Sequence, residues 1–539
     1  MNMKKIGRGP AGRVCLRAVL ILGTVCLGWS IASAATCPVV HHGPPTEADK
    51  ALLSADYAKA ESLYRAALAA SPHDTELTAD LVHALLRDQK VQEAADAVKA
   101  ALATAPGSAT LVELRGEVEL RQGEPWIAVQ TANEATKLDP CNGRTQLLIA
   151  HLLQLNSLYA SARSHLVIAH ELDPDDPQIR LWFSTLPPPR PVAEIENSQK
   201  QLTAAPTGCQ LVSSTTATQI PFANIGWQAI GLDVKLNGLA FPLRIDTGAG
   251  GLLISSSVAK RVGLKPLSPA AVGGIGDDGK RQGYSALVDS IRIGDLEFRH
   301  CKIQVVDSSV FPGGEFGLIG TDVFSHFLVT LDFPGHKLQL TPLPPRPGED
   351  ASAARSLSTG NEEEDQAARD AAGGANTGSE KAGSSGVSPG GPYDRFIAPE
   401  MRDYTKVYRV GPDLILPGQL NGSTIKLFIL DTGGFTTIIS PQAASEVTRV
   451  HNDVPLGVSG LNGAVRQISQ AEKITFQFAN LSQQVDGVIT MDLSKISRAT
   501  GMEISGLLGA STLHLLTIHL DYRDGLVKFD YDPKRAYHF

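Results

Sequence analysis

The feature that most constrains the fold of this chain is a stretch that occurs twice. Residues 243–255 read LRIDTGAGGLLIS, and residues 428–440 read FILDTGGFTTIIS. In each copy an apolar run leads into Asp-Thr-Gly and a second apolar run follows, which predicts a buried strand ending at the aspartate. A carboxylate there is costly unless it is hydrogen-bonded or functional. We therefore expect Asp246 and Asp431 to be brought face to face, one from each half of a paired structure.

The sequence around the two turns is also duplicated. Asn-Gly lies between apolar runs at 237–238 and again at 421–422, so each Asp-bearing strand is predicted to be the second arm of a hairpin. Downstream, Leu-Ile-Gly at 318–320 and Leu-Leu-Gly at 507–509 are each followed by segments that align without a gap. Each half therefore looks like one copy of a duplicated all-β unit.

Glycine-rich inserts with hairpin character follow both turns at nearly the same distance. They read GGIGDDG at 273–279 and GVSGLNG at 457–463. The repetition favours flaps that close over a bound peptide and exclude water. The alternative is a pair of ordinary surface hairpins. The candidate flap and substrate-binding residues are Gly273, Gly274, Ile275, Gly276, Gly457, Ser459 and Gly460.

With these motifs the chain resembles the aspartic protease superfamily, specifically its retropepsin-like bacterial branch. The resemblance rests on the two Asp-Thr-Gly turns, the two Leu-(Ile/Leu)-Gly motifs and residues 273–276, which are similar to the flap tip of retroviral proteases. It covers residues 221–340 and about 408–530. Ala249 after the first turn is the retroviral-type residue, whereas Gly434 departs from the usual Ala, Ser or Thr.

The resemblance implies a mechanism and a set of site residues. Asp246 and Asp431 would hold the lytic water between them, one ionised as general base and the other protonated as acid. The threonines would hydrogen-bond across the turns, and the following glycines would donate backbone N–H groups to the carboxylates. No metal or organic cofactor is implied. The supporting residues of the turns are Thr247, Gly248, Thr432 and Gly433.

The segment before the duplicated units is helical in composition and repeats every 34 residues. This period resembles the tetratricopeptide repeat, a helix–turn–helix unit, and predicts about four repeats, the first of which could lack a full leading helix. The concave face of such a stack commonly holds a peptide or protein partner. The repeated positions are Pro72, Pro106, Pro140 and Pro174, then Ala60, Ala94, Ala128 and Ala162, then Ala67, Ala101, Ala135 and Ala169.

The first 35 residues are interpreted as a secretory signal peptide. They carry five basic residues and no acidic one, then an apolar run at 18–29 that is too short to span a bilayer, then Ala-Ser-Ala at 32–34. The alternative is an uncleaved anchor. Removing these five charges takes the formal net charge from −8 to −13. A chain that acidic, with no basic stripe, argues against nucleic acid or an anionic membrane as partner.

The sequence thus predicts a secreted, periplasmic protein of several domains, with no membrane span after signal cleavage. An all-α tetratricopeptide-type solenoid would precede two all-β, retropepsin-like units. Four cysteines of the mature chain could form one or two disulfides, whose pairing stays open. These cysteines are Cys37, Cys141, Cys209 and Cys301. The predicted segments are 1–35 (signal peptide), 46–186 (repeats), 187–219 (linker), 220–341 (first β unit), 342–392 (disordered linker) and 393–539 (second β unit).

Three functional readings follow from this organisation. The leading one is an aspartic endopeptidase whose repeats recruit a protein partner or substrate. The second is a catalytically silent peptide-binding scaffold that has kept the protease shape. In the third, the protein is an enzyme, but each β unit pairs with its copy in another molecule, as retroviral proteases do.

Overall fold

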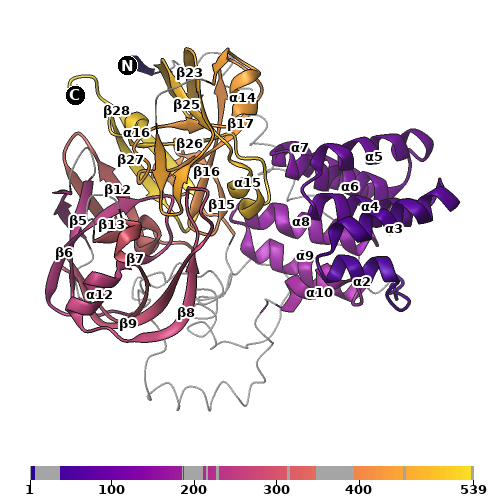
Figure 1. Cartoon of the computed structure of the whole chain (residues 1–539), viewed down its shortest axis with the longest axis horizontal. Coiled ribbons are helices and arrows are strands. Elements are labelled where there is room, and N and C mark those ends of the chain that lie inside the picture. The colour runs from indigo at the N-terminus through magenta and orange to yellow at the C-terminus, as the bar shows by residue number, and fades with distance from the viewer. Residues whose placement is uncertain are drawn as a thin grey trace. The chain divides into compact units, whose positions relative to one another are not determined.

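The structure is a computed structural model that describes residues 2–5, 37–184, 186, 210–213, 217–225, 230–311, 316–347, 394–452 and 457–535. The chain divides into two compact units. One contains the helical repeats together with residues 494–503, and the other contains the remaining, β-rich part of the chain (Figure 1). Each unit is described by itself.

The helical unit is built from antiparallel helix pairs that follow the 34-residue period, so the predicted repeat architecture is confirmed. Helix α2 has 7 residues whereas α4 has 13, so the first repeat has a short leading helix. The helices are α2 (Glu47–Leu53), α3 (Tyr57–Ala70), α4 (Thr75–Arg87), α5 (Val91–Thr104), α6 (Ala109–Arg121), α7 (Pro125–Leu138), α8 (Gly143–Leu155), α9 (Tyr159–Leu172), α10 (Pro177–Ser184) and α15 (Ser494–Thr500).

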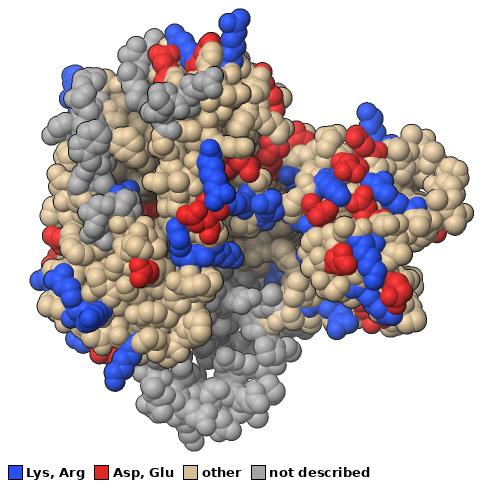
Figure 2. Space-filling view, viewed as in Figure 1, with Lys and Arg blue, Asp and Glu red and all other residues tan. Residues whose placement is uncertain are grey.

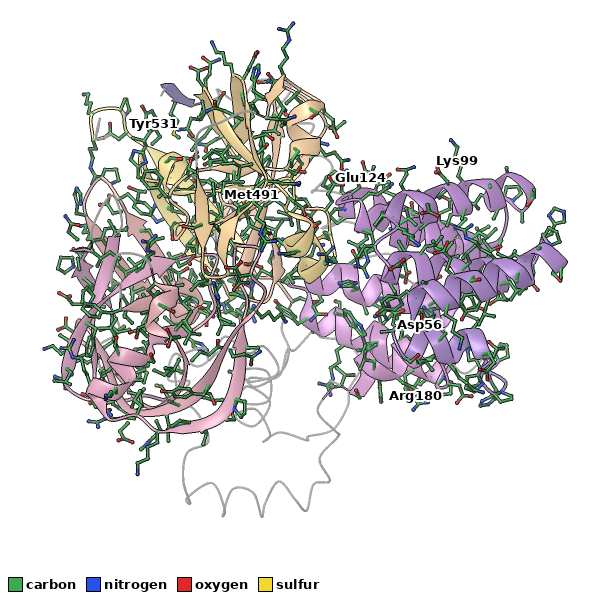
Figure 3. All side chains as sticks on the ribbon, in the orientation of Figure 1. Asp56, Lys99, Glu124, Arg180, Met491 and Tyr531 are labelled. Atoms are coloured by element: carbon green, nitrogen blue, oxygen red, sulfur yellow. A yellow bond between two sulfur atoms is a disulfide. The ribbon has the colours of Figure 1, made fainter. Side chains whose placement is uncertain are left out.

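Small residues and caps explain why these helices form and pack. The periodic alanines Ala60, Ala94 and Ala128 are fully buried, which lets neighbouring helices approach closely. At the starts of α2, α3, α4, α6 and α8, a side chain accepts hydrogen bonds from backbone N–H groups that have no partner within the helix. Asp56, which is labelled in Figure 3, caps α3 in this way. Its side chain accepts a hydrogen bond from the N–H of Lys59.

A disulfide joins Cys37 to Cys141 within the helical unit, with a Cα–Cα distance of 5.5 Å and a sequence separation of 104 residues. Because a cross-link over a long loop restricts the unfolded chain, we expect Cys37→Ser/Cys141→Ser to lower the free energy of unfolding by about 2–4 kcal/mol. Denaturant unfolding followed by circular dichroism at 222 nm measures this loss. Oxidised wild type is the reference, because reduction would also break the disulfide of Cys301; equal midpoints for the double variant and oxidised wild type would contradict the prediction.

The β-rich unit contains two half-barrels of the same design, which confirms the predicted duplication of an all-β unit. The first sheet is formed by β2 (Gln210–Leu211), β4 (Ala223–Asn224), β5 (Ile230–Leu236), β6 (Leu239–Asp246), β7 (Leu252–Ser255), β8 (Pro266–Val272), β9 (Arg281–Ile293), β10 (Leu296–Val306) and β11 (Gly317–Gly320). The second is formed by β15 (Tyr408–Val410), β16 (Asp413–Leu420), β17 (Lys426–Leu430), β18 (Ile438–Ile439), β19 (Val450–His451), β22 (Ile468–Ala471), β23 (Ile474–Phe478), β24 (Leu481–Val485), β25 (Val488–Met491) and β26 (Gly506–Leu508).

Both Asn-Gly pairs form the turns that the sequence predicts. Asn237 and Gly238 have φ values of 46° and 90°, and Asn421 and Gly422 have 48° and 74°. Positive φ at both central positions matches the right-handed twist of the strands that the turn joins. The hairpins β5–β6 and β16–β17 therefore place an Asp-bearing turn at the end of their second strand.

A third sheet joins the two halves within one chain. Its order is β14-β28-β27-β12-β13-β3, and its central pair is β12 against β27, with Val329 opposite Leu520 and Leu331 opposite Ile518. The largest hydrophobic core cluster of the described residues contains side chains from both halves. The two β units can pair within one chain or between copies of the chain, and the structure contains the pairing within one chain. The strands of this sheet are β3 (Thr218–Pro221), β12 (Phe327–Asp332), β13 (Lys337–Pro342), β14 (Thr405–Lys406), β27 (Leu516–Asp521) and β28 (Leu526–Tyr531).

The predicted disordered linker begins at residue 342, but the structure continues further along the chain. Pro342 ends β13, and Arg346 is buried with its guanidinium donating to Asp524 Oδ1 at 2.6 Å. The N–H of Phe396 donates to the same oxygen at 2.7 Å. Burial of Arg346 against an opposite charge explains why these first residues are ordered. The rest of the predicted linker, 348–392, lies outside the described residues.

The predicted signal peptide also lies almost wholly outside the described residues, since 6–36 are not described. Residues Asn2–Lys5 form strand β1, which pairs antiparallel with the edge strand β24. In the part of the chain that the structure describes, no helix combines the length and the apolar character needed to cross a bilayer.

Candidate active site

Reciprocal threonine hydrogen bonds hold the two Asp-Thr-Gly turns together. Thr247 Oγ1 donates to the carbonyl of Leu430 at 2.7 Å, and Thr432 Oγ1 donates to the carbonyl of Ile245 at 3.3 Å. Each hydroxyl also accepts the backbone N–H of the opposite threonine at 3.0 Å. Both side chains are buried, so these four bonds replace solvent for six polar groups and fix the turns face to face. The structure thus brings together the two threonines predicted to act across the turns.

The carboxylates of Asp246 and Asp431 meet between these turns. The N–H of Gly248 donates to Asp246 Oδ1 and that of Gly434 donates to Asp431 Oδ1, both at 2.8 Å. Gly433 also hydrogen-bonds the carboxylates, so the predicted donors are joined by Gly434. The two aspartates share a side-chain hydrogen bond.

Burial and mutual repulsion change the titration of this pair. Burial, followed by the charge of Asp431, raises the pKa of Asp246 to about 7. Burial also raises the pKa of Asp431, opposed by hydrogen bonds from backbone N–H groups and from Asp246. Like charges in one buried site cannot both ionise easily, so the pair retains one shared proton over a range of pH.

Steric crowding explains why Gly433 and Gly434 of the second turn are glycines. A Cβ added at Gly433 would lie 2.3 Å from Asp246 Cγ and Oδ2, and one at Gly434 would lie 2.7 Å from Asp431 Oδ2. Side chains cannot enter at such distances, so the departure at Gly434 from the usual Ala, Ser or Thr is required by this geometry. At Gly248 the nearest carboxylate atoms would lie 3.4 Å away, an ordinary contact.

The Leu-(Ile/Leu)-Gly motifs lie beside the strands that lead into the two turns. Strand β11 runs parallel to β6 and places Gly320 opposite Asp246, while β26 runs parallel to β17. A Cβ at Gly320 would lie 2.3 Å from the carbonyl oxygen of Ala249, and one at Gly509 would lie 2.2 Å from that of Thr436. Only glycine lets these motifs pass so close to the chain that leaves each turn.

The two glycine-rich hairpins meet each other at their tips, as flaps would. The N–H of Asn462 donates to the carbonyl of Ile275 at 2.8 Å, and its side-chain Nδ2 donates to the carbonyl of Gly274 at 2.9 Å. In return, the N–H of Asp278 donates to the carbonyl of Asn462 at 2.9 Å. A Cβ at Gly274 or at Gly460 would lie 2.8 Å from a side-chain atom of the other hairpin, so these predicted flap residues lie at the contact. The second hairpin comprises β20 (Val458–Gly460) and β21 (Gly463–Val465).

The remaining predicted flap residues take different places. Gly276 has a φ of 129° and approaches the carbonyl of Asn462, whereas Gly273 and Gly457 have open space where a side chain would begin. Ser459 is exposed and pairs with Ala464 inside its own hairpin.

Charged groups reinforce the contact between the hairpins. Arg281 Nε donates to the carbonyl of Leu461 at 3.0 Å, and the N–H of Arg466 donates to Asp277 Oδ2 at 2.8 Å. Asp278 forms ion pairs with Arg281 at 3.3 Å and Arg466 at 3.7 Å. The contact is therefore asymmetric, with the acidic groups contributed by the first hairpin.

Residues 232–323 match the family model described as aspartyl protease. Residues 51–118 match the tetratricopeptide repeat model, and the predicted resemblance to both is thereby confirmed. Among solved structures, a retropepsin-like aspartic protease from Rickettsia conorii is 18% identical, with 24% of this chain and 94% of that chain covered and a TM-score of 0.19. The curated proteins contain no significant match.

The aspartyl protease segment includes Asp246 and the motif at 318–320 but ends before the second turn. The assignment of the second turn to the site therefore rests on the hydrogen bonds between the turns and not on the family match. Two participants were missed in the sequence: Arg244, which donates from Nη1 to the carbonyl of Gly433 at 2.9 Å, and Asn462 of the second flap. A signal for Arg244 exists, because it is a charge inside an apolar run where the other copy has Ile429.

We expect Asn462→Ala to weaken the binding of a peptide at the site formed by the two Asp-Thr-Gly turns. The substitution removes the bond to Gly274 while leaving the backbone bonds, and one neutral hydrogen bond contributes about 1 kcal/mol. In peptide cleavage assays KM should rise about five-fold, with a smaller change in kcat. Asn452→Ala, at an exposed position of the same half, is the matched control and should leave both constants unchanged. Unchanged KM in Asn462→Ala would show that the flap contact does not affect substrate binding.

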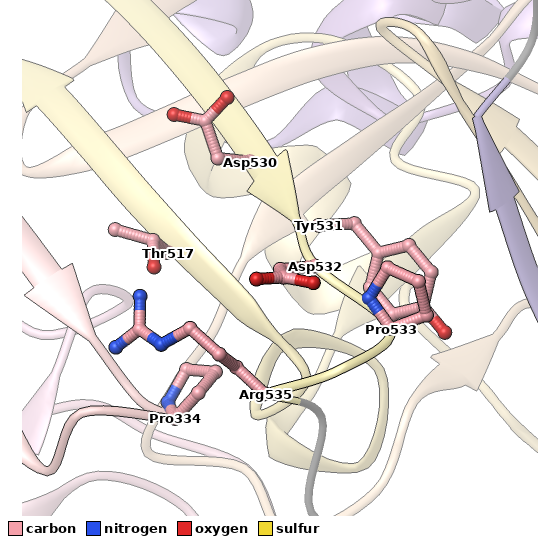
Figure 4. Close-up of a pocket in the computed structure, with 7 residues that line it drawn as sticks. All are labelled: Pro334, Thr517, Asp530, Tyr531, Asp532, Pro533 and Arg535. Carbon is pink, nitrogen blue, oxygen red and sulfur yellow. The ribbon is translucent and has the colours of Figure 1, made fainter.

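Two further clusters lie outside the dyad. A pocket of about 380 Å³ is lined by β27 and β28 residues, among them Thr517 and Asp530, and by Arg535 (Figure 4). Arg535 pairs with Asp332 at 3.0 Å, and none of the lining residues is a predicted site residue.

Figure 2 shows acidic and basic side chains interspersed over the face in view.

One group of described side chains, in the helical unit, has the spacing of metal ligands. It consists of His42, Asp173 and Asp176, whose ligand atoms lie within 4.8 Å of one another. His42 Nε2 lies 2.9 Å from Asp173 Oδ1, and Arg144 Nε donates to Asp176 Oδ2 at 2.5 Å. Because both carboxylates have partners within the protein, we assign no metal to them.

Proposed function

We propose that this chain is an aspartic endopeptidase that hydrolyses peptide bonds with a water activated by Asp246 and Asp431. The single observation that carries the proposal is the pairing of two Asp-Thr-Gly turns by reciprocal threonine hydrogen bonds, with both carboxylates facing each other. The match of residues 232–323 to aspartyl proteases supports it.

The chemistry follows from the proton shared by the pair. The ionised carboxyl accepts a proton from water as the water attacks the peptide carbonyl, and the protonated carboxyl donates to the carbonyl oxygen. Backbone N–H groups of Gly248 and Gly434 orient the carboxylates for these transfers. The flaps cover an extended substrate and hold it by strand-like hydrogen bonds, which also excludes bulk water from the reacting groups.

The repeats and the amino-terminal segment add two parts to the proposal. The helical unit recruits a protein partner or the substrate itself, which the match to tetratricopeptide repeats supports. The protein is secreted to the periplasm after its first 35 residues are removed, which the disulfide Cys37–Cys141 supports because such bonds persist in oxidising compartments. Amino-terminal sequencing of protein from the periplasmic fraction tests the second part; a chain that retains residue 1 there contradicts it.

Incubation of the mature protein with a mixed peptide library, from acid to neutral pH, tests the enzymatic proposal. Cleavage that stops with a statine-type inhibitor and is absent in Asp246→Asn supports it. A folded wild-type protein that binds the inhibitor or peptides without cleaving any of them supports the silent scaffold instead. Cleavage that Asp246→Asn leaves intact assigns the activity to other chemistry.

A further inference from the structure

Strand β6 carries a cation on the face that bears Asp246. Alternate residues of a strand point to the same face, so Arg244 and Asp246 share one face while Leu243 and Ile245, which are 0% and 1% exposed, point into the core. The equivalent of Arg244 in the second half is Ile429, which is buried. The duplicated site is therefore asymmetric, with a single guanidinium in one half.

The guanidinium reaches across to the other turn. Arg244 Nη1 donates to the carbonyl of Gly433 at 2.9 Å. Gly433 directly follows Thr432, whose hydroxyl locks the turns together, and its own N–H hydrogen-bonds the carboxylates. One side chain of the first half thus fixes the peptide unit between Gly433 and Gly434 of the second half.

We infer that Arg244 is a positioning residue of the dyad: it holds the second turn in register and supplies the positive charge that keeps one carboxyl ionised while the other retains its proton. This inference rests on the proposed function. It goes beyond the family motif, which contains the aspartate, the threonine and the glycine but no cation.

The charge of Arg244 acts in the direction that the inference requires. It lowers the pKa of Asp246 and that of Asp431, opposing the larger effect of burial on each. Other charges on the surrounding elements are engaged elsewhere: Asp322 of η4 (Thr321–Phe324) accepts the N–H of Gly251, and the flap charges bond one another. These flap charges are Asp277, Asp278, Arg281 and Arg466.

Removing the cation should therefore move the one-proton state of the dyad to higher pH. With Arg244→Leu both apparent pKa values of the pair rise, since each ionised carboxyl loses a favourable interaction. An opposite charge close to a carboxyl shifts its pKa by about 1–3 units, so we expect the pH profile to move upward by about one unit. Arg244→Lys keeps the charge but loses the planar donor, so it should restore most of the pH profile while leaving kcat reduced.

The test uses modification of the dyad rather than turnover. An epoxide alkylates the ionised carboxylate: a carboxylate oxygen attacks a ring carbon, the C–O bond of the ring breaks, and the neighbouring carboxyl gives its proton to the alkoxide. Its rate therefore reports the one-proton state. The rate against pH is measured by mass spectrometry for full-length wild type, Arg244→Leu and Arg244→Lys. Arg292→Leu, which removes an exposed arginine from the same half, is the control for net charge.

Each outcome separates the inference from the proposed function. An upward shift in Arg244→Leu, reversed in Arg244→Lys and absent in Arg292→Leu, supports the inference. If wild type is modified and the pH profile of modification is the same in Arg244→Leu, the role of Arg244 is overturned, whereas the shared dyad is still supported. If wild type is not modified at Asp246 or Asp431 at any pH, the dyad and the proposed function fail together with the inference. Unfolding of Arg244→Leu is checked by circular dichroism, and Arg244→Met then replaces it.

Discussion

Asp246→Asn and Asp431→Asn will each reduce peptide cleavage by about 10⁴-fold or more, and the double variant will be no worse than either single one. The two carboxyls divide the acid and base roles and act as a unit, so loss of either removes the mechanism. Initial rates on a cleaved peptide, measured with the single and double variants, check the prediction. Near-full activity in either single variant would show that the two turns do not form one shared site.

The raised pKa of Asp246 also predicts how the stability of Asp246→Asn, relative to wild type, changes with pH. Its folded value of about 7 lies above the usual 3.8, so the folded state binds the proton more tightly than the unfolded state. The burial penalty of this group is absent below pH about 4 and grows to its full size as pH rises to about 7. Asp246→Asn removes the penalty, so its stability relative to wild type should rise over that window. A constant difference in melting temperature across it would contradict the raised pKa.

Gly433→Ala will nearly abolish activity, whereas Gly248→Ala will change it little. The added methyl group at 433 would lie 2.3 Å from the carboxyl of Asp246, so the carboxylate has to move, whereas at 248 the nearest carboxylate atoms lie at 3.4 Å. A displacement of about 1 Å at reacting groups costs about 10²-fold in rate. Steady-state kinetics on both variants, with folding verified by circular dichroism, measures the contrast.

This pair of glycines is a matched test of the geometry, because the two turns have the same Asp-Thr-Gly sequence. The duplicated motif alone predicts equal effects at the two positions. Equal losses in the two variants would therefore contradict the asymmetric packing of the dyad, even if both losses were large.

The duplicated sequence made the half-barrels predictable because its signals are local. The Asn-Gly turns at 237–238 and 421–422, the alternating apolar runs and the Asp-Thr-Gly triplets each depend on residues a few positions apart. The 34-residue period of the helical unit is equally local, since small residues recur in the helix pairs and a side-chain cap recurs at the start of α4, α6 and α8. Local signals of this kind are readable without knowledge of the tertiary fold.

The linker boundary was misplaced because its evidence is not local. Arg346 lies in a stretch whose composition predicts disorder, yet it is buried against Asp524, about 180 residues further along the chain. Composition indicates how much apolar surface a segment can bury, but it cannot predict an ion pair with a residue far along the chain.

By itself the sequence determined that two Asp-bearing turns exist, that each ends a buried strand, and that glycine-rich hairpins follow at matching distances. The tertiary structure alone decided that both turns pair within one chain through β12 and β27, and that the flap tips bond through Asn462. It also decided that Arg244 reaches Gly433, 189 positions away. The physical reason is that strand and turn preferences arise from neighbouring residues, whereas the environment of a buried charge is set by every element packed around it.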